Sequence, residues 1–211
     1  MTPTMDRNRR HQQLELHWTM FLNSEDEASL NEAFSSLYFL SVDELMAYGR
    51  GMGFDQPTCE DGVHDVFCQV YMKRRQLSAV TNITAYLFRA FRNAMLNVHK
   101  KNAKQADKEV AQLPFFTDVT VLDTMIGDEE RRDIAATIAR LMAMLTDRQR
   151  EAVYLRYMHD MDYEEIAELM GLQVGSVRKL VYRAVTVLRA KSGQLRNPLL
   201  SMLAAWWSFT R

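Results

Sequence analysis

Basic and hydrogen-bonding side chains dominate the stretch between Val174 and Arg196. Its six charged residues are all lysine or arginine, and no acidic residue accompanies them. Small and aromatic polar residues stand among these cations. Side chains of these types bond base edges and phosphates in protein–DNA interfaces. The stretch therefore predicts a DNA-binding surface, whose candidate contact residues are Gly175, Ser176, Arg178, Lys179, Tyr182 and Arg183.

Two capping boxes and a glycine predict the helices that would carry this surface. Thr146 with Gln149, and Asp162 with Glu165, have the spacing at which side chains satisfy the free amides of a helix start. Gly171 is expected to end the second helix, because glycine adopts the left-handed conformation at little cost. After a short turn, apolar residues recur at three- and four-residue steps, at Val174, Val177, Val181, Val185 and Leu188. An ordinary helical hairpin with a solvated basic face is the alternative. The turn spacing, caps and one-sided charge together favour a helix-turn-helix over residues 145–191.

This stretch resembles region 4 of bacterial RNA polymerase sigma factors, in particular the small extracytoplasmic-function (ECF) kind. The resemblance implies that the helix-turn-helix reads the minus-thirty-five promoter element. Gln173 departs from the family pattern, which usually has a serine cap there, and glutamine is a poor cap. The matching segments are Leu145, Arg148-Gln149-Arg150-Glu151, Tyr163-Glu164-Glu165-Ile166-Ala167, Gly171, Gly175-Ser176-Val177-Arg178 and Arg183-Ala184.

Charge is strongly segregated in the first half of the chain, although the formal net charge of the whole is only −1. Ten acidic residues and the single cation Arg50 lie between Ser24 and Asp65. From Val66 to Ala106 there is no acid, while lysine and arginine accumulate. Adjacent blocks of opposite sign predict two partners of opposite charge.

Three segments within these blocks resemble region 2 of the same family. Residues 34–38 resemble its opening helix, residues 59–67 its Ala-Glu-Asp-x-x-Gln-Asp/Glu-x-Phe signature, and residues 83–93 its aromatic-Leu-x-x-Ile-Ala-x-Asn run. The resemblance implies that the signature docks on a coiled coil in the polymerase clamp. It also implies that the later helix and the loop before it melt and read the minus-ten element. His64 stands where glutamine is usual, and Tyr86 where tryptophan is common.

The residues at these positions are chemically suited to both roles. Carboxylates within two turns of one helix can meet arginines of a partner, although a solvated acidic face is the alternative. Rings interleaved with cations can stack on unpaired bases while the cations follow the backbone. Phe88 and Phe91 are the rings expected in the core instead. The implied polymerase-binding residues are Glu60, Asp61, His64, Asp65 and Phe67. The implied minus-ten residues are Asn82, Thr84, Tyr86, Arg89, Arg92, Asn93, Asn97, Lys100 and Lys101.

The predicted fold class is all-α, with two small helical domains joined by a flexible linker. Residues 1–17 are expected to form an N-terminal extension, 18–104 the region 2 bundle, 105–132 the linker, 133–193 the region 4 helix-turn-helix, and 194–211 an apolar tail. Gly49, Gly51 and Gly53 are expected to break a helix. About 26 residues of extended linker would reach on the order of 85 Å. The tail is expected to pack on the second domain or to bind a partner.

The expected function is that of an ECF sigma factor, which binds core RNA polymerase at its clamp coiled coil and flap and promoter DNA as duplex and single strands. A stand-alone helix-turn-helix regulator is the alternative. An anti-sigma factor or other regulator is a further candidate partner, which could hold the otherwise cytoplasmic protein at the membrane. No cofactor, small-molecule substrate or enzymatic activity is expected, because phosphate loops and nucleophile motifs are missing. A metal site at Cys59, His64 and Cys68 is not expected either, because Cys59 and His64 are at the wrong helical step.

Overall fold

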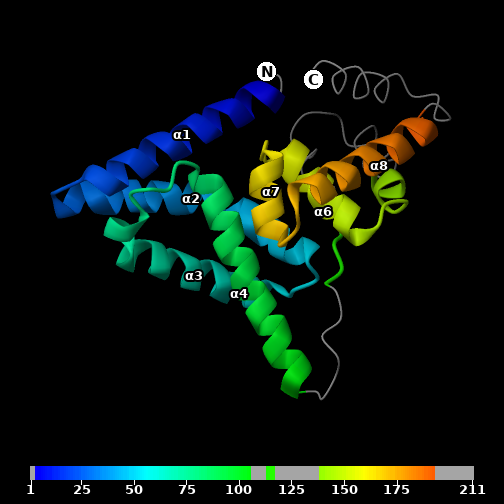
Figure 1. Ribbon diagram of the computed structural model, residues 1–211. Coiled ribbons are helices and arrows are strands. Elements are labelled where there is room, and N and C mark those ends of the chain that lie inside the picture. Colours follow the sequence, from blue (N-terminus) through cyan, green and yellow to red (C-terminus); the bar gives the residue numbers. More distant parts are fainter. Residues whose placement is uncertain (1–2, 106–112, 117–137, 193–211) are drawn as a thin grey trace, which may run out of the picture. The chain divides into compact units, whose positions relative to one another are not determined.

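The computed structural model describes residues 3–105, 113–116 and 138–192. The chain divides into two compact units, Met1–Leu113 and Pro114–Arg211. The regular elements within the described ranges are all helical (Figure 1), which confirms the predicted all-α class. Most of the expected linker, Ile134 of the second domain and the whole tail 194–211 lie outside the described residues.

The described residues of the first unit form four long helices and one short 3-10 helix. They are α1 (Pro3–Asn23), α2 (Glu27–Gly51), α3 (Gln56–Met72), η1 (Arg74–Leu77) and α4 (Ile83–Gln105). Helix α2 packs against α1, α3 and α4, and α3 also packs against α4. Aspartate caps start α2 and α3, where Asp26 accepts from the Ser29 amide at 2.8 Å and Asp55 from the Thr58 amide at 3.0 Å. These hydrogen bonds lower the pKa of both carboxyls.

Helix α1 extends the first unit further toward the N-terminus than the expected start at residue 18. Leu14 is buried, and Arg10 pairs with Glu44 of α2 at 3.0 Å. The Trp18 indole donates to the Val80 carbonyl at 3.1 Å. Arg74 donates to carbonyls at the end of α1, including that of Leu22 at 3.0 Å. Part of the expected extension 1–17 therefore packs on the core.

Two glycines allow the helices of the first unit to approach closely. A Cβ atom on Gly49 would lie 2.5 Å from Cys59 Sγ, and one on Gly62 would lie 2.2 Å from Met95 Cε. Gly49 lies inside α2, so the expectation that it breaks the helix is wrong, whereas the helix does end at Gly51. The chain turns at Gly53, which has a φ of 86°. Gly49 lies in the helix because only a residue without a side chain fits against α3 and α4.

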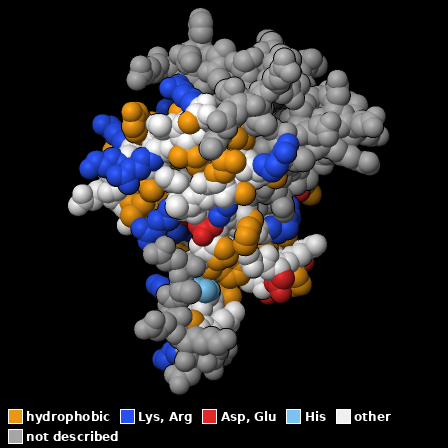
Figure 2. Space-filling view, turned by 90° about the vertical axis from the view of Figure 1, so that its right-hand side faces the viewer, with side chains coloured by type: hydrophobic (Ala, Val, Ile, Leu, Met, Phe, Trp, Pro, Cys, Tyr) orange, Lys and Arg blue, Asp and Glu red, His pale blue; other side chains and the backbone are white. Residues whose placement is uncertain are grey.

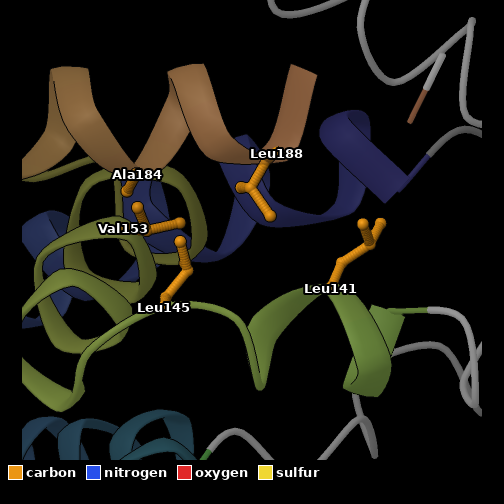
Figure 3. Packing of buried hydrophobic residues seen from close by; sticks show 5 residues of the cluster. All are labelled: Leu141, Leu145, Val153, Ala184 and Leu188. Atoms are coloured by element: carbon orange, nitrogen blue, oxygen red, sulfur yellow. The ribbon is translucent and has the colours of Figure 1, made fainter. Parts of the chain in front are cut away.

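The second unit is built on α6 (Asp147–Met158), α7 (Tyr163–Met170) and α8 (Val174–Ser192), preceded by helical residues 138–142. Helix α8 packs on both α6 and α7. Its apolar stripe is buried as predicted from Val177 onward. Figure 3 shows how side chains from separate elements meet in this core, namely Leu141, Leu145, Val153, Ala184 and Leu188.

Both predicted capping boxes are present in the second unit. Thr146 Oγ1 accepts from the Gln149 amide at 3.4 Å, and Gln149 Oε1 accepts from the Thr146 amide at 3.0 Å. The corresponding distances for Asp162 and Glu165 are 2.7 and 2.9 Å. Gly171 is left-handed, with φ 65° and ψ 41°. The local signals for the helix-turn-helix are therefore confirmed.

A short piece of the expected linker is anchored on the second unit. The Phe115 amide donates to Asp147 Oδ1 at 3.0 Å, and the Phe115 ring lies 5.4 Å from the Tyr154 ring. Phe115 is buried, whereas Phe116 is exposed. The Phe115 amide is the main cause of the lowered pKa of Asp147. The range 105–132 therefore contains a residue that belongs to the core of the second unit.

Candidate nucleic-acid interface

All six predicted contact residues on α8 are exposed: Gly175, Ser176, Arg178, Lys179, Tyr182 and Arg183. They lie opposite the buried valines Val177 and Val181, because three- and four-residue steps keep each set on its own face of the helix. Tyr182 is 72% exposed. The face of the molecule in Figure 2 carries prominent Lys and Arg groups, with acidic side chains confined to small areas. Helix α8 thus presents a basic surface rich in hydrogen-bond donors.

The start of α8 is formed by backbone hydrogen bonds. The Gln173 carbonyl accepts from the Ser176 amide at 2.8 Å and from the Val177 amide at 3.1 Å. No atom lies within 4 Å of the position that a Cβ on Gly175 would occupy, apart from its own helix backbone and chain neighbours. This open surface leaves room for a DNA backbone to approach the first turn of α8 closely.

Arg178 contacts residues of the neighbouring helix α7. Its guanidinium pairs with Glu164 at 3.3 Å and lies over the Tyr163 ring at 5.5 Å from the ring centre. Arg156 of α6 lies 5.0 Å from the same ring centre. Glu165 completes the capping box of α7, whereas the adjacent Glu164 pairs with Arg178. The Glu164 contact spans 14 positions, so helix periodicity gave no signal for it.

A second basic surface lies along α4. Asn93, Asn97, Lys100 and Lys101 are exposed, and Arg89 and Arg92 are half-buried. Tyr86 is half-buried as well, with the Arg89 guanidinium 5.8 Å from its ring centre. Burial raises the pKa of Tyr86. Tyr86 therefore offers only part of its ring surface to a ligand.

The remaining α4 residues are placed by the helix start and the core. Asn82 Oδ1 accepts from the Ala85 amide at 3.0 Å, which caps the helix. Thr84 is 7% exposed, so its side chain offers little surface to DNA, and its implied contact stays a prediction. Phe88 and Phe91 are in the core, as predicted, and Phe88 packs against Tyr48 with ring centres 5.2 Å apart.

The predicted polymerase-docking residues of α3 separate into two groups. Glu60, Asp61, His64 and Asp65 are exposed. Phe67 is 3% exposed and packs edge-on against the rings of Phe34 and Tyr38. It shares the apolar face of α3 with Val63, Val66 and Val70, so its implied part in polymerase docking stays a prediction that packing beneath the surface would have to fulfil. Tyr71, which follows the same periodicity, is 43% exposed.

Cysteine and histidine side chains of α3 do not form a metal site in the part of the chain that the structure describes. Cys59 is buried, and its burial raises the pKa of the thiol. Cys68 Sγ lies 3.4 Å from His64 Nε2 on the outer side of the helix. The described ranges contain no group of three or more side chains that could hold a metal ion. None of their helices is long and apolar enough to cross a membrane.

The fold and these surfaces define a helical DNA-binding protein with a helix-turn-helix in its second unit. Residues 135–188 match the family described as "Sigma-70, region 4". The chain is 22% identical over 163 residues to the ECF RNA polymerase sigma factor SigM of Bacillus subtilis, a match that covers 73% of this chain and 91% of SigM. It is 22% identical over 173 residues to SigW of the same organism, covering 79% and 90% of the two chains.

A solved structure of similar fold is that of the sigma factor RpoE of Bartonella quintana in its complex with the anti-sigma factor NepR. The likeness has a TM-score of 0.54 and 21% identity, and it covers 79% of this chain and 99% of that one. The region 4 match and the similarities that cover 91% of SigM and 90% of SigW together support an ECF RNA polymerase sigma factor.

Proposed function

We propose that this sigma factor binds core RNA polymerase through the acidic surface of α3 and reads the minus-thirty-five element with α8. The exposed face of α4 would bind the minus-ten element as it opens. The single observation that carries the proposal is the exposed, acid-free contact face of α8, a helix that packs on α6 and α7, both of which start at complete capping boxes. Such a helix presents donors to the major groove in helix-turn-helix proteins.

The exposed carboxylates of α3 support the docking part of the proposal. Glu60, Asp61 and Asp65 project from one helix within two turns and are exposed. Carboxylates of this kind form charge-assisted hydrogen bonds with arginines of a partner. Phe67 contributes by packing, since it lies in the core beneath this surface.

The exposed side chains of α4 support the strand-binding part of the proposal. Lys100 and Lys101 can follow a phosphate backbone, and Asn93 and Asn97 can bond to base edges. Tyr86 can stack on an unpaired base with the exposed part of its ring. Bases captured outside the duplex offset part of the unpairing energy, so binding favours opening.

In this proposed role the protein has no catalytic activity of its own, requires no cofactor and works in the cytoplasm. Its anti-sigma partner, if it resembles NepR in the RpoE complex, would bind the sigma factor directly. A stand-alone regulator is the weaker candidate, because it gives no role to the opposite charges of α3 and α4. Residues 18–104 would form region 2, and residues 133–193 would form region 4.

Reconstituted transcription tests the proposal. The purified full chain, added to core RNA polymerase with a library of bacterial promoter templates, is expected to start transcripts at a subset of them. Asp61→Asn with Asp65→Asn is expected to reduce transcription from every template and to weaken co-purification with core enzyme, because charge-assisted bonds are lost. The matched control is Glu25→Gln, which removes an exposed charge from the turn before α2. Transcription that never rises above that of core enzyme alone would contradict the proposal.

A further inference from the structure

The Arg178 side chain is restrained by two residues that precede it in the helix-turn-helix. Its Nη2 lies 3.3 Å from Glu164 Oε1, and its guanidinium lies over the Tyr163 ring. Tyr163 in turn receives Arg156, whose Nη1 donates to the Met161 carbonyl at 2.6 Å. The ring therefore links cations of α6 and α8 to the start of α7.

Stability alone does not account for this arrangement. The Arg178 and Glu164 side chains are 61% and 60% exposed, and ion pairs this exposed contribute little to folding. The two contacts do restrict the rotamers of a long, planar side chain. Their main effect is consequently on the direction in which the guanidinium points.

The neighbouring cations on the same face lack this restraint. The Lys179 and Arg183 side chains are exposed, and they make no hydrogen bond or ion pair with side chains of the described residues. A phosphate contact tolerates many side-chain directions, whereas a bidentate contact to a guanine edge requires one. Arg178 has five N–H groups, so the group paired with Glu164 leaves others for a base.

We propose that Glu164 and Tyr163 are positioning residues that orient Arg178 for a base edge and hold it back from indiscriminate phosphate binding. The Glu164 carboxylate repels a phosphate wherever α8 meets DNA. That repulsion is offset only where a base presents acceptors to the oriented guanidinium. The pair thereby raises the preference for the cognate upstream element, a refinement that rests on the proposed function.

The test measures a specificity ratio with the full chain bound to core RNA polymerase. A duplex library with a randomised upstream segment yields the preferred duplex, and its affinity is divided by that of the same duplex with the segment scrambled. Glu164→Gln is expected to lower this ratio about two- to fivefold, which lies within the range open to an exposed ion pair. Tighter binding to the scrambled duplex should supply most of the change.

Tyr163 and Lys179 provide the comparison variants. Tyr163→Leu removes the ring beneath the guanidinium and is expected to lower the ratio. Tyr163→Phe retains the ring and is expected to keep the wild-type ratio. Lys179→Gln is the matched control for a phosphate contact, so it should weaken binding to both duplexes by a similar factor. A purely structural role for Glu164 would likewise change both affinities together and leave the ratio unaltered.

A double-variant cycle identifies Arg178 as the residue through which Glu164 acts. In the Arg178→Ala background, Glu164→Gln is expected to leave the ratio unchanged. An unaltered ratio for Glu164→Gln alone, or an equal fall in both backgrounds, would overturn the inference. A wild-type ratio near one would overturn the proposed function as well, whereas clear wild-type discrimination with an unaltered Glu164→Gln ratio overturns the inference alone.

Discussion

Gly49 illustrates what a single residue contributes to this fold. Sequence patterns treat a glycine in an apolar helical stretch as a breaker. Here Gly49 is inside α2, and the Cβ that it lacks would also lie 2.9 Å from Cζ of the fully buried Phe91. Its role is to permit a close helix crossing. That role depends on which side chains of α3 and α4 face it.

Gly49→Ala is therefore expected to lower the melting temperature of the first unit. Overpacking costs about 1–3 kcal/mol, and the better helix propensity of alanine returns at most about 1 kcal/mol. Calorimetry of the full chain, with separate transitions allowed for the two units, measures the effect. Gly175→Ala is the matched control and should keep or raise stability, because its Cβ meets open space. An unchanged melting temperature of the first unit in Gly49→Ala would contradict this account.

At the scale of elements, the capping signals predicted the helices of the second unit, but no sequence pattern predicted that Phe115 is anchored in front of them. Capping boxes join residues three positions apart, so their spacing is visible in the chain. The Phe115–Asp147 hydrogen bond spans 32 positions and depends on how the segment folds back. A Phe-Phe pair within an aperiodic stretch did not reveal which ring would be buried.

Phe115→Ala is expected to destabilise the second unit by about 3 kcal/mol or more, as is usual for a buried phenylalanine. Phe116→Ala is its matched control, because Phe116 is 56% exposed and exposed substitutions usually change stability by less than about 0.5 kcal/mol. Urea unfolding of the full chain, followed by a probe in each unit, measures both. Similar losses in the two variants would show that Phe115 does not anchor the segment.

For the whole molecule, the packing of Phe115 on the second unit shortens the linker between the two units that the sequence predicted. Phe115 lies ten residues after Gln105, the last residue of α4. A fully extended chain of that length spans at most about 36 Å, less than half of the expected 85 Å. Separate promoter contacts by α4 and α8 would therefore be coupled more tightly than a 26-residue tether allows.

The proposed division of labour predicts that a premelted template compensates for a defect in α4 but not for one in α8. Tyr86→Ala removes a stacking ring worth about 1–3 kcal/mol per base, and initiation on closed duplex should fall accordingly. With the minus-ten region already unpaired, the remaining contacts should suffice to saturate binding, so the defect should become small.

Arg178→Ala is the comparison variant, and transcript yields on closed and premelted templates provide the measurement. Its defect should be similar on both templates, because the upstream element is unchanged between them. An equal defect of Tyr86→Ala on both templates would contradict a role of this ring in opening DNA.

The sequence by itself determined the all-α class, the helix-turn-helix with its caps, and the basic and acidic faces. These features depend on neighbours within a few positions, where helix geometry converts spacing directly into direction. Only the tertiary structure decided that Thr84 is buried, that Gly49 serves a helix crossing, and that Glu164 pairs with Arg178. Those outcomes depend on contacts between distant parts of the chain, whose partners no local pattern specifies.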